Sequence, residues 1–114
     1  MPLPTEDVAL VQQFVEGLNA AMPPHAARQL RYRLDTYRNA LTIVECGAVD
    51  PDDPTGDWFE VFVGRLRFTR SRGWELYYAD RDSDFHVYEL LEPTQDVRLL
   101  LAELESDPTG IFFG

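Results

Sequence analysis

Residues 58–78 read WFEVFVGRLRFTRSRGWELYY and decide the fold. Apolar and polar side chains alternate on both sides of the turn at Arg70-Ser71-Arg72, as they do in two strands of one sheet. Folding the segment at this turn places apolar residues opposite one another on one face, Phe68 with Trp74 and Leu66 with Leu76. On the other face the same register sets Arg67 against Glu75 and Arg65 against Tyr77. The stretch therefore predicts an antiparallel hairpin whose first strand runs from Trp58 to Thr69.

A second hairpin is predicted upstream. Leu30, Tyr32 and Leu34 alternate with Arg31 and Arg33, and an apolar run at residues 40–44 follows the polar stretch at residues 35–39. The expected register pairs Leu34 with Leu41 and Tyr32 with Ile43. It puts both arginines on the face opposite the core, because successive side chains of a strand point to opposite faces. Downstream, the turn from Asp80 to Asp84 leads to a fifth strand from Phe85 to Leu90.

Two segments have the spacing of amphipathic helices. Near the N-terminus Thr5 is a suitable N-cap, and the apolar residues that follow form one stripe up to Pro23-Pro24: Val8, Val11, Phe14, Val15, Leu18 and Met22. Pro93-Thr94 opens a second helix, whose stripe is Val97, Leu100, Leu101 and Leu104. The order predicts an α+β fold with an N-terminal helix, a five-stranded antiparallel meander sheet and a C-terminal helix. At 114 residues, we expect a single domain over residues 1–114.

The last eight residues, Asp107-Pro108-Thr109-Gly110-Ile111-Phe112-Phe113-Gly114, form an unusually aromatic tail. Chain ends are normally polar and frayed, so two adjacent phenylalanines call for something that buries them. Either the tail closes the protein's own core or it docks onto a partner. We expect burial within the chain, with a turn at residues 107–110 reversing its direction.

The features from Trp74 onward resemble those of a known family. They are the stretch Trp74 to Tyr78, an acidic turn, the stretch Phe85 to Tyr88, a short leucine-rich helix and the aromatic tail. This combination resembles a family of small bacterial proteins, domain of unknown function 3024, and the tail looks like the signature of that family. The resemblance implies a bacterial source and carries over no activity, cofactor or catalytic residue.

Charge and hydropathy narrow the possible partners. The chain has 20 acidic and 10 basic residues, all of the latter arginine, and a net charge of −10 disfavours binding to a nucleic-acid backbone. No apolar run reaches the roughly 18 residues of a membrane helix, and the N-terminus lacks the basic and apolar regions of a signal peptide. We therefore expect a cytoplasmic protein that does not enter a membrane, with a protein partner or a second copy of itself as the open possibilities.

No complete metal-binding pattern is present. Asp80-x-Asp82-x-Asp84 has the spacing that begins a calcium-binding loop, but Phe85 stands where that loop requires glycine. Structural zinc normally has four Cys or His ligands, and the chain offers one cysteine, Cys46, and two histidines. We therefore expect neither a metal nor another cofactor.

Catalytic signatures are also missing. A reactive Cys46 thiol would need a neighbour such as His86 to lower its pKa, and a buried, inert cysteine is the more ordinary interpretation. The nucleophile elbow, the phosphate-binding loop and the dinucleotide fingerprint are absent. Whether the chain is an enzyme stays open, with the balance against catalysis.

The polar face of the sheet is the best candidate for a binding site. Seven side chains should project from it or from neighbouring strands: Arg31, Arg33, Arg65, Arg67, Tyr77, His86 and Tyr88. Guanidinium groups beside phenolic hydroxyls can recognise a carboxylate or a phosphate. The alternative is a solvent-exposed face joined by cross-strand ion pairs, which contribute little.

Two functions remain. The first is a binding or protein-interaction domain without recognisable catalysis, whose acidic C-terminal third, including Glu103, Glu105 and Asp107, could face a basic partner. The second is a small-anion binding protein, or a minor enzyme, that uses the arginine and tyrosine face.

Overall fold

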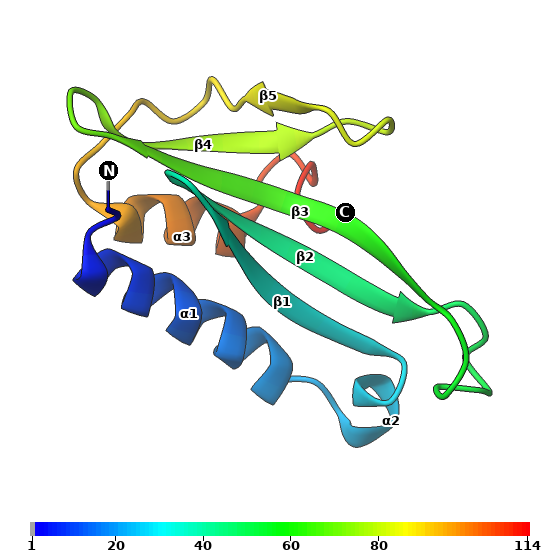
Figure 1. The fold of residues 1–114 in the computed structure, drawn as a ribbon. Coiled ribbons are helices and arrows are strands. Elements are labelled where there is room, and N and C mark those ends of the chain that lie inside the picture. The colour runs from blue at the N-terminus through cyan, green and yellow to red at the C-terminus, as the bar shows by residue number, and fades with distance from the viewer. Residues whose placement is uncertain (1) are drawn as a thin grey trace.

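The computed structural model describes residues 2–114 and has an α+β fold. Its elements in order are α1 (Thr5–Ala20), α2 (Pro24–Ala27), β1 (Leu30–Tyr37), β2 (Ala40–Ala48), β3 (Trp58–Thr69), β4 (Gly73–Ala79), β5 (Phe85–Val87) and α3 (Val97–Ser106). The five strands form one antiparallel sheet in the order β1-β2-β3-β4-β5, and α1 and α3 lie together on one of its faces (Figure 1). We call this the helix side and the opposite face the open face.

The two predicted hairpins differ in how well their registers were anticipated. Between β3 and β4 the predicted pairs all occur: Arg65 with Tyr77, Leu66 with Leu76, Arg67 with Glu75 and Phe68 with Trp74. Between β1 and β2 the predicted register is wrong by two residues, because Leu34 pairs with Ile43 and the strands continue to a tight turn after Tyr37. Arg38 takes a left-handed conformation in that turn, with φ 54°. A shift of two residues leaves every side chain on its predicted face.

The element ends depart from prediction at three places. α1 begins at Thr5 without a side-chain cap, so Thr5 is not the N-cap. α3 begins at Val97, later than expected, because Thr94 forms a bridge with Trp74 at the edge of the sheet and the carboxylate of Asp96 then accepts a hydrogen bond from the Arg98 amide. The short helix α2 had no sequence prediction.

The core lies between the sheet and the two long helices. Its largest fully buried side chain is Trp74, whose indole nitrogen donates to Asp7 of α1 at 2.8 Å. Apolar residues of α1 and α3 at helical spacing, including Val11, Val15, Leu100 and Leu104, pack against the sheet residues Ile43, Leu66 and Leu76. The strands β1 to β4 therefore each turn apolar side chains toward the helices, as alternation allows.

The aromatic tail folds back onto the core. Phe112 is buried, with 7% of its surface exposed, and its ring lies 5.0 Å from that of Tyr88. Phe113 is partly buried and meets Tyr32 edge-on at 6.0 Å. Asp107 arranges this return: it ends α3 in a left-handed conformation, with φ 41°, and its carboxylate accepts hydrogen bonds from the amides of both phenylalanines. The predicted burial of the tail within the chain is confirmed for Phe112 and is partial for Phe113.

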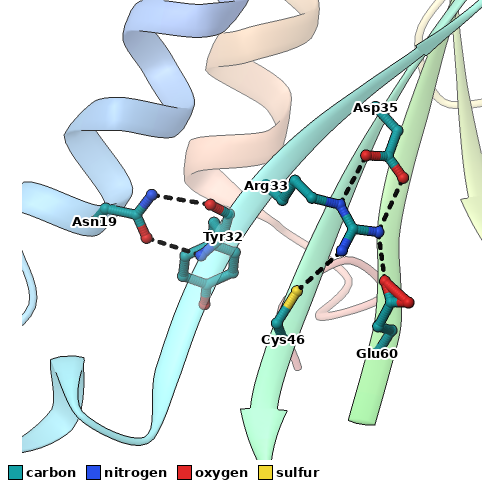
Figure 2. Close-up of polar contacts among 6 residues, drawn as sticks. All are labelled: Asn19, Tyr32, Arg33, Asp35, Cys46 and Glu60. Atoms are coloured by element: carbon teal, nitrogen blue, oxygen red, sulfur yellow. Dashed lines mark hydrogen bonds and ion pairs between the residues drawn. The ribbon is translucent and has the colours of Figure 1, made fainter. Parts of the chain in front are cut away.

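One outer edge of the sheet is closed by a side chain. The carboxamide of Asn19, in α1, accepts from the Tyr32 amide at 2.7 Å and donates to the Tyr32 carbonyl at 2.9 Å (Figure 2). A carboxamide presents a donor and an acceptor side by side, as a peptide group does, so Asn19 takes the place of a neighbouring strand at Tyr32, near the start of β1. Exposed strand edges invite pairing with other chains, and Asn19 blocks this one at Tyr32.

Candidate functional site

The pairing of the strands brings five of the seven predicted site residues to the open face. Arg31 and Arg33 of β1 lie opposite Cys46 and Val44 of β2, and Arg65 and Arg67 of β3 lie opposite Tyr77 and Glu75 of β4. Within residues 2–114 no helix covers this face (Figure 1). The four arginines and Tyr77 therefore share one surface, and what each guanidinium contacts decides what the surface can bind.

Arg33 is held by two carboxylates. Its guanidinium donates to Asp35 at 2.7 and 2.9 Å and also bonds Glu60 of β3, while a third nitrogen lies 3.6 Å from the sulfur of Cys46 (Figure 2). Hydrogen bonds to Asp35 and Glu60 raise the pKa of Arg33 above its ordinary value, and the bond from Arg33 lowers the pKa of Asp35. A guanidinium shared by two carboxylates has little charge left for a further anion.

Arg31 and Arg65 lie over aromatic rings. The Arg31 guanidinium is 4.2 Å from the ring centre of Trp58, and that of Arg65 is 3.8 Å from the ring centre of Phe85. Arg65 also donates to the hydroxyl of Thr42 at 2.9 Å. Such cation–π contacts fix the guanidinium over the ring and cover the apolar surface beneath it. The arginines thus act largely as a covering layer for the open face.

A shallow groove of about 530 Å³ lies among these side chains. It is lined by Arg31, Tyr32, Arg33, Cys46, Trp58 and Glu60. Cys46 is buried and its neighbour is Arg33, whereas His86 bonds Asp80 at 2.7 Å on another part of the sheet. Within the described part of the chain the polar neighbour of the thiol is therefore Arg33 and not His86.

The other two predicted site residues are not on the open face. His86 pairs with Tyr78, whose side chain packs on the core, so it projects on the helix side of the sheet. Tyr88 is 3% exposed and donates to Glu103 of α3 at 2.6 Å. The predicted placement was wrong for one reason, the register of β5 against β4. His86 lies opposite Tyr78, so it projects on the helix side. Tyr88, two residues further on, projects on the same side, and its amide donates to the carbonyl of Leu76 at 2.8 Å.

The helix side instead holds two tyrosines with strongly shifted pKa values. Burial, followed by the hydrogen bond to Glu45, raises the pKa of Tyr32 to about 12. Burial, followed by the hydrogen bond to Glu103, raises the pKa of Tyr88 to about 12. In both cases a neutral phenol donates to a carboxylate, and neither of these two tyrosines loses its proton near neutral pH.

One feature relevant to binding had no sequence prediction, namely the part of β3 that runs past the end of β4. β4 pairs with β3 only from Arg65 to Thr69, so residues 58–63 have β2 on one side and no strand on the other (Figure 1). We call residues 58–63 the β3 overhang. Two of its apolar side chains on the helix side are exposed, Phe59 by 44% and Val61 by 49%. The sequence carried a signal of it, because the predicted strand from Trp58 to Thr69 is longer than the stretch between the turns at residues 70–72 and 80–84.

Among residues 2–114, no group of three or more His, Cys, Asp or Glu side chains is placed to hold a metal ion. Over the same residues, no helix has the length and hydropathy needed to span a membrane.

Comparisons with known proteins give a family and nothing more specific. No curated protein and no solved structure matches the chain. The model of the family described as Domain of unknown function (DUF3024) matches residues 2–114, the full extent of the fold described above. The chain therefore belongs to the DUF3024 family.

Proposed function

We propose that this chain is a cytoplasmic bacterial protein-interaction domain without a catalytic role. The observation that carries the proposal is the β3 overhang. Phe59 and Val61 stay exposed there, where β3 has no neighbouring strand of residues 2–114 on the side away from β2. Apolar side chains that gather beside unpaired strand backbone are typical of surfaces that another chain covers. The single, buried cysteine fits a reducing compartment, and the resemblance to a bacterial family supports the source.

The proposal is tested by site-specific crosslinking in the native host. A photoreactive benzophenone amino acid replaces Val61 in the overhang or, as the matched control, Leu99 on α3, because the two side chains are equally exposed, by 49% and 48%. We expect a discrete crosslinked protein at position 61 and none at position 99. The absence of a discrete adduct at position 61, or the same adducts at both positions, would remove the proposal. An adduct of twice the monomer mass would identify the partner as a second copy of the chain instead of another protein.

A small-anion binding function is the second candidate. Arg31 and Arg67 form no ion pair with a carboxylate in residues 2–114, and Arg67 shares the open face with Tyr77. The charges of these two arginines are therefore not offset by a carboxylate, as that of Arg33 is by Asp35 and Glu60. Thermal unfolding with phosphate or a dicarboxylate at millimolar concentration tests this function. A rise in melting temperature that Arg31→Ala or Arg67→Ala removes would support it, and an unchanged melting temperature would exclude it.

A further inference from the structure

The backbone of the β3 overhang points its free hydrogen-bonding groups outward. The amide of Val49 donates to the carbonyl of Asp57 at 2.9 Å, which makes this a hydrogen-bonded pair of the ladder between β2 and β3. Such pairs alternate along an antiparallel ladder, so the next ones along β3 are Phe59 and Val61 with their partners on β2. Trp58, Glu60 and Phe62 consequently direct their amides and carbonyls away from β2. No strand of residues 2–114 pairs with them there.

Beside this edge there is room for another chain. A groove of about 480 Å³ has the overhang residues Glu60, Val61 and Phe62 as one wall. Its other wall is formed by residues 79–81 and Ser83, from the turn between β4 and β5, and by residues 110–114 of the tail. The groove therefore occupies the position next to β3 that β4 vacates where its pairing ends at Arg65. An extended segment placed there would meet the outward backbone groups and would also cover Phe59 and Val61 on the helix side.

The charge around the groove indicates which kind of extended segment would bind there. Asp50, Asp52, Asp53 and Asp57 precede the overhang, and Asp80, Asp82 and Asp84 follow in the turn that forms the far wall, against the single arginine Arg81. The chain as a whole has a net charge of −10. A second copy of the overhang would bring these two acidic segments against each other, because antiparallel self-pairing sets the start of one strand beside the end of the other. A basic segment would be attracted at both ends of the groove.

We propose that the β3 overhang binds an extended, arginine- or lysine-rich segment of a partner protein as an additional strand of the sheet. The inference rests on the proposed interaction function and specifies its site and the chemistry of its partner. Backbone hydrogen bonds to Trp58, Glu60 and Phe62 supply the pairing. On the helix side, apolar residues of the segment cover Phe59 and Val61. On the open face, a basic residue lies opposite Glu60, which already shares a guanidinium with Arg33.

The probe is a capped, fluorescent heptapeptide in which arginine and valine alternate, followed by fluorescence anisotropy with the purified full chain. Two control peptides separate the contributions. One has glutamate in place of arginine, which reverses the charge. The other has the same side chains but methylated backbone amides at alternate positions, which removes the donors of one edge. We expect saturable binding of the arginine peptide, and a loss of about tenfold or more with either control, the size of at least one lost hydrogen bond.

A pair of variants tests the same edge from the side of the protein. Glu60→Pro removes the central outward amide, which makes no bond to β2, and proline is tolerated at such edge positions. Glu60→Ala removes the same carboxylate and keeps the amide. We expect Glu60→Pro to bind the arginine peptide about tenfold more weakly than Glu60→Ala, with similar melting temperatures. If Glu60→Pro does not fold, the binding of the methylated peptide to the wild-type chain still tests whether backbone hydrogen bonds contribute.

Three results would overturn the inference. Equal binding by the two Glu60 variants, with equal binding of the methylated peptide, would mean that charge alone attracts the probe. Equal binding of the glutamate peptide would remove the basic partner. A wild-type dimer that Glu60→Pro dissociates and Glu60→Ala does not would assign the edge to a second copy. A crosslinked partner at position 61 together with the first result would leave the interaction domain standing and exclude only strand addition.

Discussion

The two faces of the sheet exclude water in different ways. On the helix side, Ile43 and Leu66 are fully buried under apolar residues from α1, α3 and the tail. On the open face Val44 is equally inaccessible, at 0% exposure, although no helix of residues 2–114 covers it; its cross-strand neighbours are Arg33 and Phe62. One face is sealed by elements distant in sequence and the other by long side chains lying across neighbouring strands. Disturbing the helix side should therefore cost much stability. Disturbing the open face should have a small effect that stays near the changed residue.

The largest effect is expected from the tail on the helix side. Phe112→Ala removes a ring that packs against Tyr88 and lies near Gly64 and Leu104, so the free energy of unfolding should fall by about 3–5 kcal/mol. Phe113→Ala should cost clearly less, because that ring is only partly buried. Urea unfolding of the two variants measures both. A cost below about 1 kcal/mol for Phe112→Ala would show that the tail is not part of the core.

A smaller effect, again confined to the helix side, is expected at high pH. The pKa of Tyr32 and that of Tyr88 rise from 10.0 to about 12 on folding, so the unfolded chain loses these protons first. Stability is therefore full below pH 10 and falls as the pH rises toward 12. At pH 11 the loss should be roughly 1 kcal/mol for the buried Tyr88 and smaller for Tyr32, because solvent screens its partly exposed side chain. Chemical unfolding of Tyr88→Phe across this range should show a shallower decline than wild type. Parallel curves for the two proteins would contradict the assignment.

The smallest effect on stability is expected on the open face. Arg33→Ala breaks two half-exposed ion pairs and should cost at most about 1 kcal/mol. Its clearer consequence is access to the buried thiol of Cys46, which Arg33 contacts, so the reaction with a thiol reagent should accelerate several-fold. Arg67→Ala, on the same face and without an ion pair in the described residues, is the control and should leave the rate unchanged. Equal rates in all three proteins would mean that arginines do not seal this face.

Sequence patterns predicted the fold well where side chains of neighbouring strands had to match one by one. The hairpin of β3 and β4 was predicted residue by residue, because a shift of one residue would have opposed apolar and polar side chains and the turn at Arg70-Ser71-Arg72 fixed the remaining choice. The register of β1 and β2 was missed because a shift of two residues leaves alternation intact. What decided it was the left-handed Arg38, which allows the tight turn after Tyr37, and arginine is not a typical residue for that conformation.

The candidate site was less predictable because it depends on where strands stop. Alternation placed Arg31, Arg33, Arg65 and Arg67 on one face, but it could not show that Arg33 would be shared by Asp35 and Glu60, a residue 27 positions away. His86 and Tyr88 were misplaced together, because alternation separates the two faces of β5 but does not show which face meets the helices; the register with β4 decides that. The β3 overhang has an unpaired edge because β3 is longer than β4, and alternation alone does not predict the length of a strand.

Asn19 determines what kind of assembly an open sheet edge can lead to. A molecule with one long open edge can at most be completed by a single added chain, whereas one that is open on both sides can be extended without limit, as a fibre is. The Asn19 carboxamide is hydrogen-bonded to the backbone of Tyr32, so it keeps β1 from being a second open edge. Replacement by aspartate, even through slow deamidation, would set a carboxylate against a carbonyl oxygen. The sheet would then offer unpaired backbone at β1 as well as at the β3 overhang, and copies could add at both edges as they do in a polymer.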